Sequence, residues 1–336
     1  MIIEAISKIV DGIDLSKNEM IDVMTEILKG EVTDAQIAAF ITSLRIKGET
    51  VEEIAGAVQV MRKMATKVNT RAENVVDTCG TGGDAANTFN ISTTAAFVAA
   101  GAGATVAKHG NRSVSSRSGS ADVLKTLGVN IDIDEKKIER CLNEIGIGFL
   151  FAPRLHGAMK HAIGPRREIK IRTIFNILGP LSNPAGTKNQ LIGVYDSKLT
   201  GTLARVLQDI GSDHIFVVHG KDGMDEMTLT TNTSVAELKN GTIKEYEFNP
   251  KDYGLVLCKT EDLQGASPEE NAEITKSILS GARGPKRDIV LLNAAAAIIV
   301  SKKADDFPKA ISLAEESIDS GAACQKLEKL IKLTQT

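Results

Sequence analysis

The sequence predicts an α/β protein, in which a small all-helical N-terminal domain precedes a larger α/β domain with a mainly parallel central sheet flanked by helices. Three observations lead to this prediction. The chain has 336 residues, which exceeds the usual size of one domain. Residues 1–66 carry only helix signals. From Asn74 onwards, short apolar runs alternate with helical segments, as in a parallel sheet covered by helices.

Residues 1–66 carry the signals of four short helices. The first covers Ile2–Val10, and each of the others is expected to begin with a capping box, in which a hydroxyl accepts the N3 amide and an N3 acid or amide reaches back. The pairs are Ser16 with Glu19, Thr33 with Gln36 and Thr50 with Glu53. The even spacing of these starts also suggests a solenoid, but the starts share no further side-chain identity, so we favour a compact helical domain.

Beyond Asn74, strands are expected at Val75–Val76, Thr105–Ala107, Ile147–Phe151, Leu191–Tyr195 and Ile215–Val218. A hairpin that turns at Asn240-Gly241 follows, and then three helices, the first opened by Ser267-Pro268. Residues 165–185 interrupt the alternation with helical stretches bounded by Pro165, Pro180 and Pro184. We expect this segment to join the helical domain of residues 1–66, which leaves 71–164 and 186–336 for the α/β domain.

The composition excludes several classes of protein. A net charge of -3 gives no reason to expect a nucleic-acid partner. The four cysteines lie far apart without a CxxC pair, so the sequence indicates neither a zinc site nor a disulfide framework, and a cytoplasmic location fits. The most apolar runs, residues 95–107 and 289–300, are too short and too rich in alanine for a membrane span.

The stretch DTCGTGGD, residues 77–84, follows the first strand and has the composition of a phosphate-binding loop. Gly80, Gly82 and Gly83 would let backbone N–H groups turn towards a ligand without a Cβ in the way. A helix then starts near Asn90, where free N–H groups and the helix dipole favour an anion. The alternative is an ordinary strand–helix turn with an Asn or Ser cap. The dinucleotide pattern and the P-loop both fail, because the required acid and the required Gly-Lys-Ser/Thr are absent.

Two further loops at strand ends carry charge. Residues 108–116, KHGNRSVSS, combine Lys108 and Arg112 with several serines, which favours an anion site over a solvated basic loop. After the strand at Ile215–Val218, Asp225 and Glu226 are adjacent. Such carboxylates repel unless they share a proton or a cation, and Mg²⁺ bound by carboxylates, water and substrate phosphates is the natural partner. A turn with two solvated acids is the alternative for this pair.

Together these motifs resemble one enzyme family. DTCGTGGD, NIST, KHGNR, GSADVL, RTIFNILGPLSNPA, DGMDE and RDIVLLNAAAA are similar to the motifs of the anthranilate phosphoribosyltransferases of tryptophan biosynthesis, and the resemblance runs nearly end to end. It implies a glycosyltransferase (a pentosyltransferase) that joins anthranilate to 5-phosphoribosyl 1-diphosphate (PRPP), giving N-(5-phosphoribosyl)anthranilate and pyrophosphate, with Mg²⁺. It also implies a helical domain joined to an α/β domain, and a homodimer that pairs through the helical domain.

The resemblance further implies which residues bind the substrates. The PRPP site would consist of Gly80, Gly83, Asp84, Thr88, Asn90, Ile91, Ser92, Thr93, Lys108, His109, Gly110, Asn111, Arg112, Ser113, Val114, Ser115, Ser116 and Ser120. Anthranilate would contact Gly80, Asn111 and Arg166, and magnesium would be held by Ser92, Asp225 and Glu226. The chain departs from the family pattern at Ala85, Met224 and Thr228–Thr231, and none of these is an implied ligand.

These residues suit catalysis by positioning and electrostatics. The leaving pyrophosphate needs charge neutralisation, which Mg²⁺, Lys108 and loop amides can supply. The aromatic amine is neutral at pH 7 and needs no strong base, so we expect no certain catalytic residue beyond the electrostatic group of Lys108, Asp225 and Glu226. His109 is the nearby group that could accept a proton. The planar fork of Arg166 suits a carboxylate.

Two other functions stay open at this point. A pyrimidine nucleoside phosphorylase shares the expected architecture, but its phosphate loop would have Lys-His-Ser before the glycines, where this chain has Asp77-Thr78-Cys79. A non-catalytic relative that binds nucleic acid would need a basic groove, which the net charge of -3 does not favour.

Overall fold

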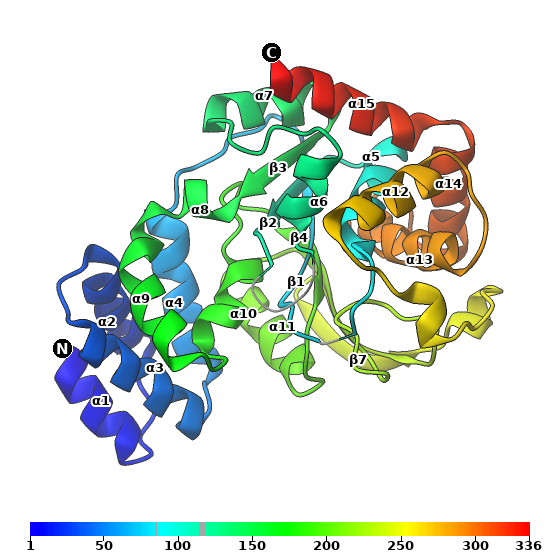
Figure 1. Ribbon diagram of the computed structural model, residues 1–336. Coiled ribbons are helices and arrows are strands. Elements are labelled where there is room, and N and C mark those ends of the chain that lie inside the picture. Colours follow the sequence, from blue (N-terminus) through cyan, green and yellow to red (C-terminus); the bar gives the residue numbers. More distant parts are fainter. Residues whose placement is uncertain (85, 114–117) are drawn as a thin grey trace.

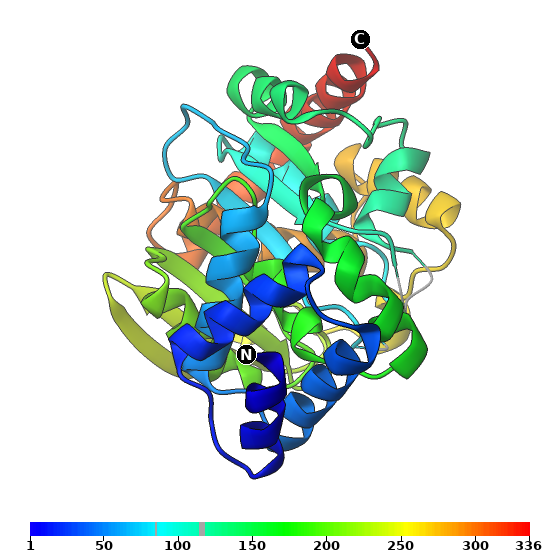
Figure 2. The same cartoon turned by 90° about the vertical axis from the view of Figure 1, so that its left-hand side faces the viewer.

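The computed structural model describes residues 1–84, 86–113 and 118–336. The N-terminal region forms four helices (Figures 1 and 2), namely α1 (Ile2–Val10), α2 (Lys17–Lys29), α3 (Asp34–Lys47) and α4 (Val51–Met64). Ser16, Thr33 and Thr50 are the N-caps of α2, α3 and α4. Each side chain accepts a hydrogen bond from the N3 amide, and the N3 side chain accepts one from the N-cap amide. All three predicted capping boxes are confirmed, and with them the starts of these helices.

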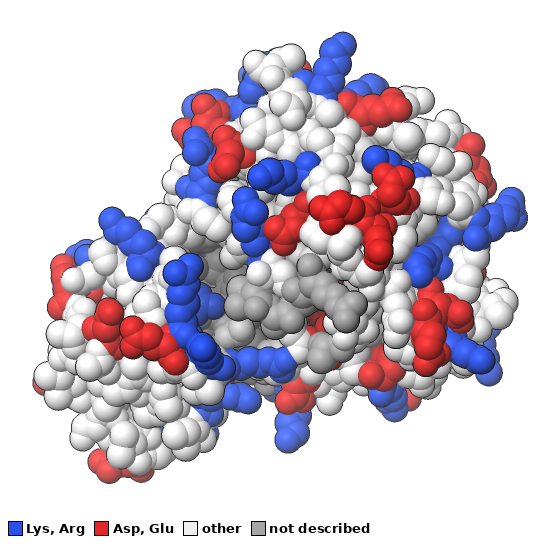
Figure 3. Space-filling view, viewed as in Figure 1, with Lys and Arg blue, Asp and Glu red and all other residues white. Residues whose placement is uncertain are grey.

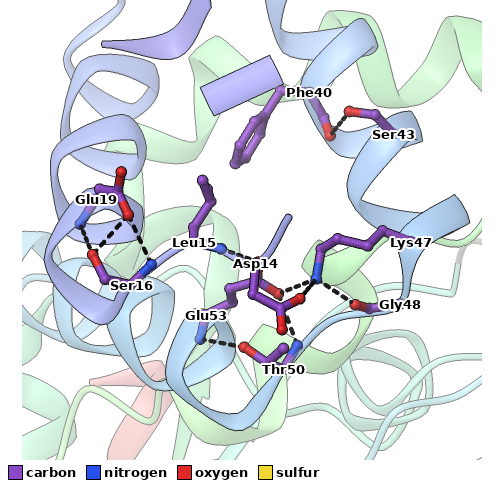
Figure 4. A network of polar contacts seen from close by, with 10 residues as sticks. All are labelled: Asp14, Leu15, Ser16, Glu19, Phe40, Ser43, Lys47, Gly48, Thr50 and Glu53. Atoms are coloured by element: carbon purple, nitrogen blue, oxygen red, sulfur yellow. Dashed lines mark hydrogen bonds and ion pairs between the residues drawn. The ribbon is translucent and has the colours of Figure 1, made fainter. Parts of the chain in front are cut away.

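The capping box of α4 belongs to a buried ionic network (Figure 4). The side chain of Glu53 is fully buried, and its two oxygens accept hydrogen bonds from the Leu15 amide at 2.9 Å, the Thr50 amide at 2.8 Å and the Lys47 ammonium at 3.0 Å. Lys47 also donates to Asp14 at 2.5 Å. Burial alone would lower the pKa of Lys47, but its hydrogen bonds to the two carboxylates raise that pKa instead. The network thus joins α3, α4 and the α1–α2 loop with every charge paired.

The larger domain is built on a seven-stranded sheet in the order β3-β2-β1-β4-β5-β6-β7. The strands are β1 (Val76–Gly80), β2 (Val106–Gly110), β3 (Ile147–Phe151), β4 (Asn189–Gly193), β5 (His214–Gly220), β6 (Thr233–Lys239) and β7 (Thr242–Phe248). β1 to β5 are parallel, whereas β6 and β7 form an antiparallel hairpin. Asn240 and Gly241 both have positive φ, as a two-residue hairpin turn requires. The predicted strands and hairpin are confirmed, although most strands extend beyond their apolar runs.

Alternate residues of the central strands enter two different cores. Leu191 and Phe216 pack with the helices α5 (Ile91–Gly101), α13 (Pro285–Val300), α14 (Phe307–Asp319) and α15 (Ala322–Gln335). Ile192 and Val217 point to the opposite face, where they pack in one core with α11 (Leu199–Asp209) and the four N-terminal helices. The helical bundle is therefore continuous with one face of the sheet and lies beside it in Figure 1.

The segment after β3 returns to the helical bundle. It forms α8 (Ala152–Leu155), the 3-10 turn η1 (Gly157–Met159), α9 (Lys160–Ile169) and α10 (Ile174–Leu181). α9 contacts α2 and α3, and α10 contacts α3 and α4. Pro165 and Pro180 were expected to bound these helices but lie inside them, because both rings are buried and their packing offsets the lost backbone bond. We propose that this segment, about residues 165–185, and residues 1–66 form one domain, with 71–164 and 186–336 as the other.

The remaining helices complete the α/β domain. They are α6 (Ser120–Thr126), α7 (Glu135–Ile145), α12 (Pro268–Leu279) and the 3-10 turns η2 (Pro250–Tyr253) and η3 (Thr260–Leu263). The prediction of three helices after the hairpin is wrong, since residues 268–336 form four α-helices: Gly321, with φ of 76°, separates α14 from α15. None of the helices in the described ranges is long and apolar enough to cross a membrane.

Candidate active site

The sheet has a topological switch point between β1 and β4. These strands are neighbours, although β2 and β3 lie between them in the chain, so the connections run in opposite directions on the two sides of the pair. In open parallel sheets, ligands bind outside the carboxyl ends of the strands at such a point. Gly80 and Gly193 are paired at these ends. The loops that follow β1, β2 and β5 meet there, and they carry most of the residues predicted to bind the substrates, whereas Arg166 lies on α9.

Asp225, in the loop after β5, lies directly against the switch point. A Cβ at Gly80 would overlap the Asp225 carboxylate, and a Cβ at Gly193 would overlap its backbone carbonyl. The carboxylate accepts a hydrogen bond from the Gly82 amide at 2.7 Å. These glycines were expected to turn their backbone N–H groups towards a ligand. In the structure Gly80 instead leaves room for the Asp225 side chain, and the Gly82 N–H donates to the carboxylate of Asp225.

Three carboxylates gather at this point. Glu226 accepts a hydrogen bond from the Ser92 amide at 3.1 Å, and Asp84 accepts one from the Asp225 amide at 3.4 Å. Burial, together with the charge of Asp84, raises the pKa of Asp225 to about 7. Burial and the charge of Asp225 raise the pKa of Glu226 to about 8. The site thus holds more negative charge than it can stabilise alone.

Lys108 is a cation whose charge acts on this acidic group. It was expected in a loop, but it lies inside β2, a strand buried on both faces, and its side chain is only 4% exposed. Its ammonium donates to the Thr78 carbonyl and, at 3.4 Å, to Ser92 Oγ. Burial lowers the pKa of Lys108, and the charge of Asp77 beneath it opposes that effect. Ser92 therefore lies between the ammonium and Glu226.

The chemistry of the residues around the acids fits Mg²⁺. Within the ranges that the structure describes, no three carboxylate, imidazole or thiolate groups are arranged as a complete metal site. Mg²⁺ does not need one, because it usually keeps several waters and takes one or two carboxylates together with substrate phosphates. Asp225 and Glu226, both with raised pKa values, and the Ser92 hydroxyl form a donor set of this kind. A divalent cation would relieve the repulsion between the carboxylates.

His109 is also part of β2 rather than of the loop. Its Nδ1 lies 3.1 Å from the Gly179 carbonyl, and its ring centroid lies 5.1 Å from that of His156. Burial and the neighbouring His156 lower the pKa of His109 to about 3, and burial lowers that of His156 to about 4. Both imidazoles are therefore neutral at pH 7, and among the described residues neither buried Nε2 atom has a hydrogen-bond partner. His156 was not identified from the sequence, where a single histidine after α8 gives no signal.

The second loop is closed by polar contacts at its base. Asp122 in α6 accepts hydrogen bonds from the amides of Ser113 at 3.2 Å and Gly119 at 3.0 Å, and it lies 3.5 Å from the guanidinium of Arg112. Ser120 Oγ donates to the Asn111 carbonyl at 3.3 Å. These contacts bring both ends of the loop together beside the site.

The other predicted PRPP residues differ in how they could reach a ligand. Ile91 and Thr93 are buried at 1% exposure in the first turn of α5, so they can contribute only backbone groups. Thr88 forms an isolated bridge with Gln264, and Gly83 accepts a hydrogen bond from Arg172 through its carbonyl. Gly110 ends β2 beside Asn111. The predicted ligands Val114, Ser115 and Ser116, like Ala85, lie outside the described residues.

Arg166 is a half-buried cation on α9. Its guanidinium lies 5.2 Å from the centre of the Phe175 ring, and burial lowers its pKa. Among the described residues no carboxylate forms an ion pair with it, so its planar fork is available for an anionic ligand. Figure 3 shows Lys and Arg side chains gathered along the boundary between the helical bundle and the α/β domain, a distribution that attracts anions.

Two family models match the chain. The model for the helical bundle domain of a glycosyl transferase family covers residues 3–65, and the model for the a/b domain covers residues 72–324. The chain is similar to the anthranilate phosphoribosyltransferase of Acetivibrio thermocellus, with 54% identity over 100% of this chain and 97% of that protein. It is 55% identical to the enzyme of the same name from Geotalea uraniireducens, over 99% of both chains.

Solved structures agree with these matches. The crystal structure of anthranilate phosphoribosyltransferase from Thermus thermophilus superimposes with a TM-score of 0.94 at 37% identity, covering 99% of both chains. The enzyme from Saccharomyces cerevisiae in complex with PRPP and Mg superimposes with a TM-score of 0.90 at 30% identity, over 99% of this chain and 98% of that one.

Proposed function

We propose that this chain, which belongs to the anthranilate phosphoribosyltransferase family, carries out the reaction of that family at the carboxyl ends of β1, β2 and β5. It is an enzyme of the glycosyltransferase class that transfers the phosphoribosyl group of PRPP to the amino group of anthranilate, a step of tryptophan biosynthesis. The products are N-(5-phosphoribosyl)anthranilate and pyrophosphate. The C1–O bond to pyrophosphate breaks, the C1–N bond to anthranilate forms, and the amine releases a proton.

One observation gives the strongest support to this location of the active site. Asp225 and Glu226 are half-buried at the switch point with raised pKa values, next to Lys108 and between two loops rich in amides and hydroxyls. A site with excess negative charge is unsuited to a diphosphate alone and suited to a diphosphate that arrives with a divalent cation. We propose Ser92, Asp225 and Glu226 as the residues that hold Mg²⁺.

The chain's own residues would then act on the leaving group by electrostatics. When bound, Mg²⁺ would neutralise negative charge on the diphosphate oxygens. Lys108, fixed by the Thr78 carbonyl and Ser92, places its charge in a site where burial strengthens electrostatic interactions. The first turn of α5 directs N–H groups and the positive end of the helix dipole at the same region.

Anthranilate, the acceptor of the phosphoribosyl group, would bind at the part of the site that faces the helical domain. Arg166 can hold the anthranilate carboxylate through two hydrogen bonds, with Asn111 and Gly80 completing this side of the site. The Nε2 of neutral His109 is buried and unpaired among the described residues, and with a pKa of about 3 this imidazole is too weak a base to hold the proton of the amine at pH 7.

We also propose a cytoplasmic homodimer. Its support is an apolar surface on the helical bundle, where Ile3, Val10, Ile13 and Ile46 are exposed by 51% to 81%. Pairing through these side chains would remove them from water. The four cysteines are free thiols, as a reducing compartment allows.

The loss of anthranilate fluorescence on addition of PRPP and Mg²⁺ tests the proposed function directly. We expect turnover only when the enzyme and both additions are present. A parallel assay with inorganic phosphate and thymidine or uridine should show no phosphorolysis. Folded protein without fluorescence loss, or with phosphorolysis of either nucleoside, would contradict the proposal.

A further inference from the structure

Asn90 joins the two loops of the site. It occupies the N-cap position of α5, yet its side chain does not cap the helix. Instead its Nδ2 donates to the Ser118 carbonyl at 3.1 Å, and its Oδ1 accepts from Ser118 Oγ at 3.2 Å. Asn90 ends the glycine loop, and Ser118 ends the second loop just before α6. A single side-chain amide therefore connects the two segments proposed to hold PRPP.

Behind Asn90 lies a second buried amide, that of Asn271 on α12. Asn271 is 1% exposed; its Nδ2 donates to Asn90 Oδ1 at 3.0 Å, and its Oδ1 accepts from the Ala266 amide at 2.9 Å. Both ends of this relay are backbone groups with fixed roles, because the Ala266 N–H can only donate and the Ser118 carbonyl can only accept. Each side-chain amide between them therefore has one favoured orientation.

The segment before α12 supports the same part of the glycine loop. The Phe89 amide donates to the Leu263 carbonyl at 3.2 Å, and the Gly265 amide donates to the Asn87 carbonyl at 2.9 Å. Residues 263–271 thus run alongside residues 87–90. Within this segment, Asn271 is the residue whose side chain contacts a side chain of the proposed site, that of Asn90.

We propose that Asn271 is a positioning residue for PRPP: by fixing the orientation of the Asn90 amide, it holds the two substrate loops in the arrangement that binds the diphosphate. The inference rests on the proposed function, since it assumes that PRPP lies between these loops. Asn271 itself lies behind Asn90 and acts through it. Without Asn271 the Asn90 amide can rotate, so the binding-competent arrangement is only partly populated and the apparent affinity for PRPP falls by that fraction.

Steady-state kinetics of Asn271→Ala test this inference. We expect the KM for PRPP to rise roughly tenfold, as for the loss of one buried hydrogen bond, with kcat and the KM for anthranilate within about twofold of wild type. Ser317→Ala is the matched control. It removes a buried hydrogen bond of 2.7 Å from Ser317 of α14 to the Val98 carbonyl of α5, away from Asn90 and the two loops. We expect it to lower the melting temperature and leave the KM for PRPP unchanged.

A double-mutant cycle with Asn90→Ala separates positioning from a general structural effect. If Asn271 acts through Asn90, Asn271→Ala has no further effect on the KM for PRPP in the Asn90→Ala background. Should Asn271→Ala fail to fold, the isosteric Asn271→Asp takes its place in the cycle. A wild-type KM for PRPP in a folded variant, or the same rise in both backgrounds, would overturn the inference. The wild-type enzyme is assayed alongside: its inactivity counts against the proposed function, whereas an active wild type with an unaffected variant counts against Asn271 alone.

Discussion

Each of the two domains contains acidic side chains that are wholly or partly shielded from water, and the two clusters differ in how their charge is balanced. In the helical domain, Glu53 is surrounded by the Lys47 ammonium and two backbone amides (Figure 4). At the switch point of the sheet, Asp225 and Glu226 face one another and Asp84, with Lys108 as the nearby cation. The first cluster is complete within the chain, whereas the second becomes complete only with a bound cation.

This difference separates a structural site from a functional one. A buried charge that the fold itself pairs contributes to a defined structure, whereas one left without compensation destabilises the empty protein and persists where binding requires it. Substitutions should therefore have opposite effects on stability in the two clusters.

The largest effect is expected for activity at the unbalanced cluster. Asp225→Asn combined with Glu226→Gln should reduce kcat/KM by roughly 10²–10³-fold, because the charges that would hold Mg²⁺ are gone. The melting temperature of the metal-free protein should stay equal or rise, since buried repulsion is also removed. Glu245→Gln, which changes an exposed carboxylate, serves as the control. Turnover near that of wild type at limiting Mg²⁺ would contradict the assignment of the metal site.

The balanced cluster should respond in the opposite way. Glu53→Ala removes one of the two carboxylate partners of the buried Lys47, leaving only Asp14, and leaves the Leu15 and Thr50 amides unsatisfied. We therefore expect a loss of about 3–5 kcal/mol in the free energy of unfolding. Denaturation by urea measures this loss, and kcat/KM of the folded variant should be near normal. Glu19→Ala, in the exposed capping box of α2, should cost about 1 kcal/mol. Equal losses of unfolding free energy for Glu53→Ala and Glu19→Ala would show that the buried capping box stabilises the protein no more than the exposed one.

The unpaired histidines predict a dependence on pH. The pKa of His156 is about 4 in the folded protein and near 6.5 when unfolded, so the unfolded chain binds the extra proton. The stability that this group contributes is therefore present above pH 6.5 and is lost as pH falls towards 4, by on the order of a few kcal/mol. The stability of His156→Gln, followed by urea denaturation at each pH, should fall less steeply than that of wild type. Parallel pH curves would show that His156 is not buried in its neutral form.

The smallest effect is expected at the proposed binding site for anthranilate. Arg166→Lys keeps the charge but loses the planar fork, so the KM for anthranilate should rise about tenfold while the KM for PRPP stays unchanged. Arg167→Lys, the exposed neighbour on α9, provides the matched control. If the KM for PRPP rises instead, Arg166 binds the diphosphate and not the carboxylate of anthranilate.

Local signals in the sequence were sufficient for much of the fold. The hydroxyl–acid spacing of Thr50 and Glu53 predicted a helix start because a capping box involves residues only three apart. The Asn240-Gly241 turn was predictable for the same reason, since both residues adopt positive φ locally. The family was also evident, because its motifs are short stretches that keep their order along the chain.

Only the tertiary structure decided how these stretches combine at the site. The close fit of Asp225 against Gly80 and Gly193, the pairing of His109 with His156 and the contact between Asn90 and Asn271 each join residues far apart in the chain. The covering of both faces of β2 likewise determined that Lys108 is buried. Burial and long-range contacts set the pKa values and amide orientations, so the charge imbalance of this site exists only once the sheet has brought its loops together.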